Sequence, residues 1–293
     1  MADNKDNHHR KQVLCFRGAG LLAFYFFGTW KTVCDVPDLQ KLFGYDACVL
    51  RGISSGSLVA TMIADEIPFE VAVRTFHEHL RQEQQEHPQA KDSRSSLFLR
   101  WGRECRVRFG IVAPFVRSLV LPEHLPRLQG RLSIAVFSFR VMAVICNDRW
   151  RDIDHLIEWL LAAMTIPFIT SWPRTVTTFE GETHLAMDAF NFDLWRPMRV
   201  WAWIWNWMTR VFCWLTRRQR PRMSEEKQQQ IVQVSPIENI DGIKPQRLFS
   251  IFDVIKPHAE EKQRLLFAIG RLAALRYWTT RLEHNLLAKY ARS

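Results

Sequence analysis

Short apolar runs of strand length alternate with longer apolar or amphipathic runs in the N-terminal part of the chain. Runs rich in β-branched and aromatic residues predict strands, whereas longer runs with helical spacing and no internal proline predict helices. On this basis we expect strands at 12–16 and 45–51. We expect helices at three places, Leu21–Val33, Ser55–Glu66 and Phe69–Glu86.

The same alternation continues through the rest of the chain. Residues 132–145 have period-two character and predict a pair of strands, and residues 231–236 predict a late strand. Further helices are expected at 152–164 and 259–290. Strands that alternate with helices pack as a sheet covered by helices. We therefore expect a three-layer α/β/α fold with a mostly parallel central sheet.

The chain of 293 residues is long enough for one large domain. We expect that domain to span residues 13–293, after a disordered polar tail at 1–12. The formal net charge is +10, and 30 of the 40 basic residues are arginine, which favours an anionic partner. The N-terminal residues lack the apolar run of a signal peptide, and the six scattered cysteines predict buried, reduced thiols. These features predict a cytoplasmic protein.

A serine between two glycines lies where the second predicted strand meets the second predicted helix. The sequence from Gly52 to Gly56 is Gly-Ile-Ser-Ser-Gly. This G-x-S-x-G spacing suits a sharp strand-to-helix turn, because the two backbones approach too closely there for a β-carbon. Ser54 is therefore a candidate nucleophile. The alternative is that Ser54 or Ser55 only caps the helix that follows.

A second turn of small residues, Arg17-Gly18-Ala19-Gly20, lies between the first strand and the first helix. Small residues let backbone N–H groups converge on an anion, as an oxyanion hole requires. The alternative is a phosphate loop of the G-x-G-x-x-G type, but residue 23 is alanine and no suitable acidic residue follows the second strand. A plain glycine turn is equally compatible with this stretch.

A third segment, residues 163–190, adds a motif that distinguishes between protein families. Residues 163–169, AMTIPFI, follow a predicted helix and lead through a loop to residues 183–190, THLAMDAF. A helix ending in A-x-x-I-P-F, followed by a short strand that ends in an aspartate and a small residue, resembles the catalytic-aspartate region of the patatin-like phospholipases. With the two turns before it in this order, the sequence from about 13 to 193 resembles that family, and most closely its adipose triglyceride lipase branch.

The resemblance implies a Ser–Asp dyad that hydrolyses lipid acyl esters with no metal or organic cofactor. Position by position, Ser54 matches the nucleophile, Asp188 matches its base, Gly52 and Gly56 match the flanking elbow, and the amides of Gly18, Ala19 and Gly20 match the oxyanion hole. An aspartate within hydrogen-bond reach can take the serine proton directly. His184 is expected to have a structural role.

Two positions depart from the family pattern, because Ala23 and Ala189 stand where glycines are usual. Alanine replaces glycine only where φ is negative and the backbone has room. The alternative function is therefore a catalytically inactive patatin-like protein that serves as a lipid-surface binding or scaffold module.

A basic, tryptophan-rich stretch at about 194–230 is longer than the resemblance requires. Between residues 194 and 224 it contains seven arginines, six tryptophans and no acidic residue. Tryptophan and arginine together favour a lipid interface, with rings at headgroup depth and guanidinium groups on phosphates. The alternative is a core helix with a basic end, and nucleic acid is the less expected partner. The membrane-contact candidates are Trp201, Trp203, Trp205, Trp207, Arg217, Arg218 and Arg220.

Together these features predict a serine acyl hydrolase that cleaves carboxylic esters of glycerolipids or phospholipids. We expect it to act as a phospholipase A or an acylglycerol lipase, peripherally associated with an anionic membrane or a lipid droplet. No apolar run is long and charge-free enough to predict a membrane-spanning helix.

Overall fold

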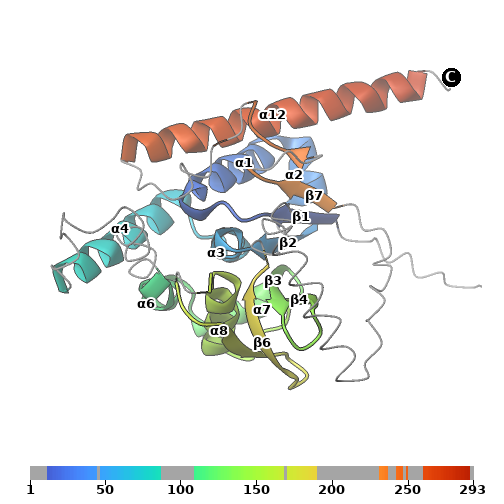
Figure 1. Ribbon diagram of the computed structural model, residues 1–293. Coiled ribbons are helices and arrows are strands. Elements are labelled where there is room, and N and C mark those ends of the chain that lie inside the picture. Colours follow the sequence, from blue (N-terminus) through green and yellow to red (C-terminus); the bar gives the residue numbers. More distant parts are fainter. Residues whose placement is uncertain are drawn as a thin grey trace, which may run out of the picture.

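The computed structural model describes residues 12–44, 47–86, 109–167, 170–189, 231–236, 242–246, 249 and 260–290, with side chains in the last helix described as far as 281. Strands and helices alternate along these residues (Figure 1). The strands are β1 (Gln12–Phe16), β2 (Cys48–Ile53), β3 (Leu132–Ser138), β4 (Ala143–Asn147), β5 (Arg174–Thr177), β6 (Thr183–Asp188), β7 (Ile231–Val234) and β8 (Gly242–Ile243). The helices are η1 (Gly20–Leu22), α1 (Phe24–Asp35), α2 (Pro37–Phe43), α3 (Ser55–Ala64), α4 (Phe69–Glu86), α6 (Val112–Leu119), η3 (Pro122–His124), α7 (Leu125–Leu128), α8 (Ile153–Ala163) and α12 (Glu260–Tyr290).

The strands form one mixed sheet in the order β5-β6-β3-β2-β1-β7-β8, with β4 paired to β3. Neighbouring strands from β3 through β2, β1 and β7 to β8 are parallel. The pairings of β3 with β4, β3 with β6 and β5 with β6 are antiparallel. The protein is thus an α/β fold whose mostly parallel central sheet is flanked by helices, which confirms the predicted fold class.

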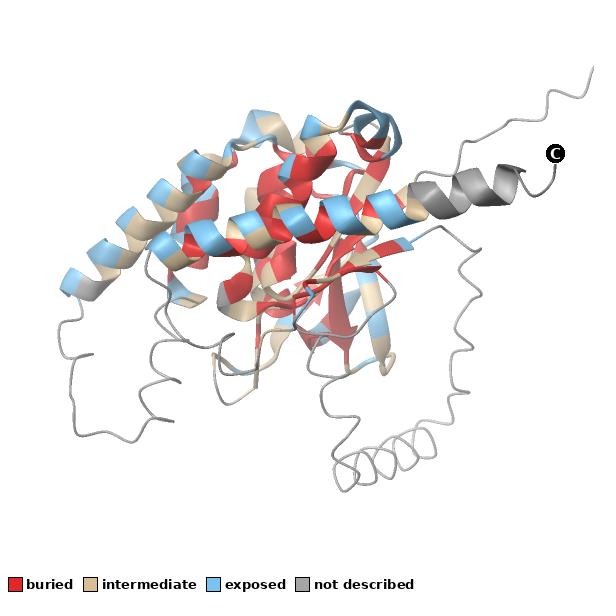
Figure 2. Ribbon diagram, turned by 90° about the horizontal axis from the view of Figure 1, so that it is seen from above, coloured by how far each residue is buried: buried red, intermediate tan, exposed pale blue. Residues whose placement is uncertain are grey.

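The main hydrophobic core lies between the sheet and the helices packed on one of its faces. Alternate residues of the central strands enter this core, because successive side chains of a strand point to opposite faces. Helix α3 packs against β2 and β3, and α8 packs against β3, β5 and β6. In the view of Figure 2 the buried residues are concentrated beneath α12, whose outer face is exposed.

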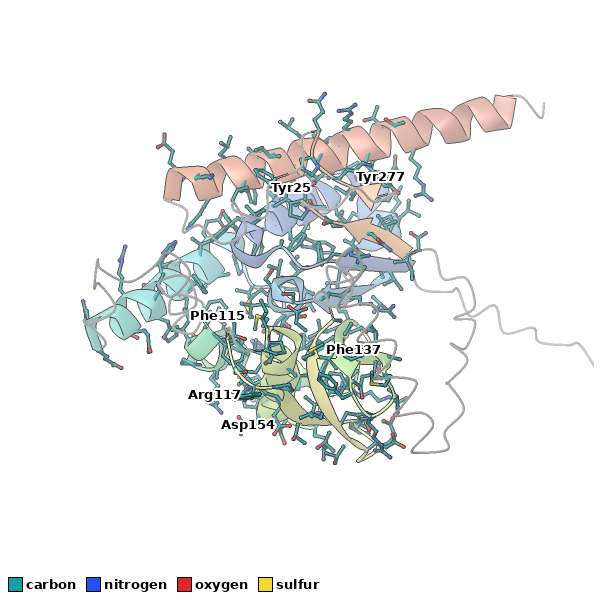
Figure 3. All side chains as sticks on the ribbon, viewed as in Figure 1. Tyr25, Phe115, Arg117, Phe137, Asp154 and Tyr277 are labelled. Carbon is teal, nitrogen blue, oxygen red and sulfur yellow. The ribbon has the colours of Figure 1, made fainter. Side chains whose placement is uncertain are left out.

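Helix α12 crosses α1 at two glycines. A β-carbon at Gly28 would overlap the carbonyl oxygen of Phe267, and one at Gly270 would overlap the carbonyl oxygen of Tyr25. Tyr25 is fully buried on α1, next to α12 (Figure 3). Because both contacts are between backbones, this crossing cannot accept larger residues at the two glycines. It fixes α1, and with it the end of the turn at 17–20, against the C-terminal helix.

Most of the predicted elements are present, although several begin or end elsewhere. Helix α4 has the predicted bounds. Strand β2 extends beyond the predicted range 45–51, because Ile53 still pairs with Ala135 of β3. Helix α1 begins at Phe24 rather than Leu21, since the 3-10 turn η1 comes first.

Some expectations fall on residues outside the described ones. These are the predicted tail as far as residue 11 and the tryptophan- and arginine-rich stretch at 194–230. Within the described part of the chain, no helix has the length and apolar character needed to cross a membrane. Of the cysteines described, Cys15 and Cys48 are buried as predicted, whereas Cys146 on β4 is exposed.

Candidate active site

Ser54 lies between β2 and α3 in a backbone conformation that residues with a side chain rarely adopt. Its φ is 56° and its ψ is −135°. Its carbonyl oxygen accepts a hydrogen bond from the Ser57 amide at 2.9 Å, which closes the turn. Ser54 is the N-cap residue of α3, but its hydroxyl makes no capping hydrogen bond. Capping therefore does not explain this serine, whose side chain stands at a strained strand-to-helix turn.

The two glycines that flank Ser54 are required by close backbone contacts. A β-carbon at Gly52 would overlap the Cα atom of Ser57 at the start of α3. A β-carbon at Gly56 would overlap the carbonyl oxygen of Phe16 and lie 3.0 Å from that of Arg17. The first turn of α3 thus packs directly on its own strand and on the end of β1, in the manner that the G-x-S-x-G spacing predicts.

The turn at 17–20 lies against this elbow. Gly18 and Ala19 are buried, and Gly20 has a φ of 52°, which favours glycine. The Ala19 amide donates a hydrogen bond of 3.2 Å to Oγ of Ser55. Ala23 has a φ of −52°, so alanine fits there without backbone strain. The first departure from the family pattern is therefore compatible with the turn.

Asp188 is the last residue of β6 and is 1% exposed. Its amide donates a hydrogen bond of 3.0 Å to the carbonyl oxygen of Thr165, just beyond α8, so β6 is tied to the Ile-Pro segment that the sequence singled out. Ala189 is buried. Among the described residues, positive φ at positions other than glycine occurs at Ser54, Glu66 and Met142. Alanine at 189 therefore needs no left-handed backbone.

The register of β3 brings the ends of β2 and β6 together. Ile134 and Ala135 pair with both β2 and β4, whereas Val136, Phe137 and Ser138 pair with both β4 and β6. Strand β4 pairs with one edge of β3 over residues 134–138, so β2 and β6 must both pair with the other edge. Strand β2 is parallel to β3 and β6 is antiparallel, so their carboxyl ends meet on this edge.

At the meeting point, Ile53 is opposite Ala135 and Asp188 is opposite Val136. These positions are one residue step apart along the edge, a rise of about 3.3 Å. Ser54 follows Ile53 directly. The candidate nucleophile and the candidate base therefore come from two strand ends that meet in the sheet, although they are far apart in the sequence.

The alternation of side chains puts the Asp188 carboxylate on the face of the sheet that α3 covers. Gly52 faces α3, and its pairing partner Ile134 belongs to the main core on that face. Val136 lies on the same face as Ile134, and Asp188 pairs with Val136. The next residue of β3, Phe137, joins a small separate cluster on the opposite face (Figure 3). The carboxylate thus lies on the side of the α3 N-terminus.

The electrostatics of this end of α3 favour an anion. The first turn of α3 carries no acidic side chain, and the unpaired N–H groups of a helix N-terminus hold a partial positive charge. The N-terminus of α3 is therefore an electrostatically favourable place for an anion next to Ser54.

His184 is buried on β6 with structural partners. Its Nδ1 is 3.0 Å from Oγ of Ser138, and its Nε2 is 3.5 Å from a carboxylate oxygen of Glu182. Burial, with the nearby Arg140 charge, lowers the pKa of His184, so the neutral ring is favoured. Asp188 lies four residue steps farther along β6, a distance of about 13 Å. These contacts agree with the structural role expected for His184.

The sequence did not predict two contacts of this site, the bond from the Ala19 amide to Ser55 and the bond from the Asp188 amide to Thr165. Ser55 was considered only as a cap, and Thr165 was part of a motif without a role of its own. Among the described residues, no cluster of histidine, cysteine or acidic side chains is suited to hold a metal ion. The proposed membrane-contact residues at 201–220 lie outside the described residues.

Comparison with known proteins identifies a family to which most of the chain is similar. A family model described as patatin-like phospholipase matches residues 14–191, which is more than half of the chain. The solved structure of VipD from Legionella pneumophila is similar with a TM-score of 0.40 and 9% sequence identity, over 92% of this chain and 67% of that one. No curated protein sequence matches the chain significantly.

Proposed function

The chain belongs to the patatin-like phospholipase family, and we propose that it is a serine acyl hydrolase of lipid esters in which Ser54 is the nucleophile and Asp188 its base. Members of this family are lipid acyl hydrolases that use a serine, so the family sets the reaction class. The assignment of individual roles rests on the residues of this chain.

The observation that carries the proposal is the shared edge of β3. Strands β2 and β6 end next to each other there, one leading into Ser54 and the other ending in Asp188. A second support is the backbone of Ser54, whose positive φ has no capping role to explain it. Strained residues of this kind persist where the surrounding structure holds them, and they cluster at active sites.

The reaction that this arrangement supports has two halves. Oγ of Ser54 attacks the ester carbonyl carbon while the Asp188 carboxylate accepts the hydroxyl proton. The tetrahedral intermediate collapses, the bond from carbon to the alcohol oxygen breaks, and Asp188 gives its proton to the leaving alcohol. Water then attacks the acyl-serine with Asp188 again as base, which releases the fatty acid and restores Ser54.

The negative charge of the tetrahedral intermediate needs donors that are already in position. We assign this task to amides of the turn Gly18-Ala19-Gly20, helped by the N-terminus of α3. Support comes from the hydrogen bond between Ala19 and Ser55, which joins the turn to the elbow.

The substrate class follows from the resemblance and from charge. The likeness of the motifs to the adipose triglyceride lipase branch favours acylglycerols or phospholipids as substrates. The net charge of +10 and the basic stretch at 194–230 favour peripheral association with an anionic membrane or a lipid-droplet surface.

The test uses a soluble chromogenic ester and a serine-directed fluorophosphonate probe. Ser54→Ala and Asp188→Asn should each lower kcat by about 10³-fold or more, and by similar factors, because the two groups act as a unit. The probe should label wild type and not Ser54→Ala. The control is His184→Gln, which should keep most of the activity. Labelling of Ser54→Ala, or an inactive His184→Gln beside an active Asp188→Asn, would refute the dyad.

A further inference from the structure

The elbow and the turn at 17–20 are joined by one specific side-chain contact. The amide of Ala19 donates a hydrogen bond of 3.2 Å to Oγ of Ser55. Ala19 is 1% exposed, and Ser55 is the first residue of α3. The oxygen that accepts this bond thus belongs to the residue next to Ser54 in the chain.

A steric contact and a hydrogen bond act on the same junction in different ways. The absence of a β-carbon at Gly56 lets the start of α3 rest on the carbonyl groups of Phe16 and Arg17. That contact sets how close the two turns are, but van der Waals contact does not select one orientation of a peptide plane. The hydrogen bond to Ser55 does, because it is directional.

The orientation of this peptide plane matters for the amides that follow. Ala19 has φ −138° and ψ 0°, and Gly20 has φ 52°. The backbone therefore turns sharply at these two residues, and turns formed by small residues are common anion-binding sites. The Ser55 hydroxyl accepts the Ala19 N–H and so fixes the peptide plane that precedes Ala19. The Gly20 amide belongs to the next peptide plane, so its direction relative to Ser54 is fixed as well.

We propose that Ser55 is a positioning residue of the hydrolase, whose hydroxyl holds the oxyanion turn at a fixed orientation to the nucleophile. The inference rests on the proposed function and divides its oxyanion hole into two roles. The Ala19 amide anchors the turn to the elbow, and the Gly20 amide donates to the oxyanion. Ser55 therefore acts through Ala19 and does not itself touch the reacting atoms.

The test compares three variants of the full chain on a soluble ester. Ser55→Ala removes the acceptor, and Ser55→Thr keeps a hydroxyl at the same position. Ser57→Ala is the matched control, because the Ser57 hydroxyl is equally on α3, buried, and without a hydrogen-bond partner among the residues that the structure describes.

We expect Ser55→Ala to lower kcat by about 10- to 100-fold, since small displacements of oxyanion donors weaken transition-state stabilisation. Its KM should remain within about twofold of wild type, because the ground-state ester does not yet carry the charge. Ser55→Thr should restore most of kcat, and Ser57→Ala should leave it unchanged. Ser55→Ala should melt a few degrees below Ser57→Ala, because it leaves the buried Ala19 amide without its acceptor, whereas Ser57→Ala removes a hydroxyl that has no partner among the described residues.

A second measurement tests the contact without any turnover. Hydrogen exchange at the Ala19 amide should be faster in Ser55→Ala than in wild type, and unchanged in Ser57→Ala. Unchanged exchange in Ser55→Ala would overturn the inference, as would an unchanged or raised kcat. A wild type that neither hydrolyses esters nor reacts with the fluorophosphonate would refute the proposed function, while the exchange experiment would still decide whether Ser55 holds the turn.

Discussion

Replacing Ser54 by glycine should stabilise the protein while it abolishes hydrolysis. Ser54 has φ 56° and ψ −135°, a region that costs a residue with a β-carbon about 1–3 kcal/mol. Glycine adopts this region freely, but it loses more conformational entropy on folding, about 0.5–1 kcal/mol. With about 2 kcal/mol of strain relieved, the free energy of unfolding should rise by about 1 kcal/mol, and the melting temperature by about 2–3 °C.

Two controls separate strain from the other effects of this change. Ser54→Ala removes the hydroxyl but keeps the β-carbon, so it should be inactive and lie within about 0.5 kcal/mol of wild type. Ala60→Gly, in the middle of α3, puts glycine into a regular helix at a buried position and should cost about 2 kcal/mol, of which about 1 comes from the helix and about 0.8 from the lost buried methyl group. Urea denaturation followed by circular dichroism measures all three variants. If Ser54→Gly lost as much stability as Ala60→Gly, the argument that the elbow stores strain would be wrong.

Three further predictions concern the rest of the molecule. Gly270→Ala should lower the free energy of unfolding by about 2 kcal/mol or more in urea denaturation, because its β-carbon would overlap the Tyr25 carbonyl. The control is Ala268→Ser at an exposed position of α12, which should change the free energy of unfolding by less than about 0.5 kcal/mol. Burial raises the pKa of Asp65 in spite of its 2.9 Å contact with His124, so its ionisation opposes folding. As pH rises from 4 to 7, the stability of Asp65→Asn relative to wild type should therefore increase, and a constant difference in urea titrations would contradict this. The third prediction concerns a variant in which four arginines of the basic stretch, Arg217, Arg218, Arg220 and Arg222, are replaced by glutamine. It should bind anionic vesicles at least about tenfold more weakly in sedimentation assays, while hydrolysis of a soluble ester stays unchanged. If wild type bound neutral and anionic vesicles equally well, the proposal that the basic stretch at 194–230 contacts an anionic membrane would be refuted.

The parts of the fold that follow local patterns were predictable from the sequence. Helix α4 has the expected bounds, since its amphipathic run begins just after Pro68. Helix α8 begins at Ile153, one residue after the predicted start, because Asp152 is its N-cap residue and the Asp152 carboxylate accepts the His155 amide at 2.7 Å. The elbow at Ser54 was also predictable, because its glycines at plus and minus two are a local steric requirement.

Other features left too weak a pattern to predict. Helix α6 contains Pro114 in its first turn, where proline is tolerated, but this interrupts the periodic signal. Strand β8 has two residues, too few for any alternation. The sharing of one edge of β3 depends on pairing between segments far apart in the chain, and nothing local to Ser54 or Asp188 specifies it. Asp188 was singled out through a family resemblance, which carries this non-local information.

The shared edge of β3 also sets when the site can exist during synthesis of the chain. The elbow at Ser54 is made early, and β2 can pair with β1 at once, but β3 must leave the ribosome before β2 gains its second partner. Asp188 follows much later on β6, a strand that pairs with β3 at Val136, Phe137 and Ser138. A nascent or truncated chain that ends before β6 therefore carries the candidate nucleophile without its candidate base. In the finished protein, opening of these few pairs, together with loss of the hydrogen bond between the Asp188 amide and Thr165, would separate the two candidate residues without melting the rest of the sheet. The proposed activity would then report on the attachment of β6 rather than on global folding.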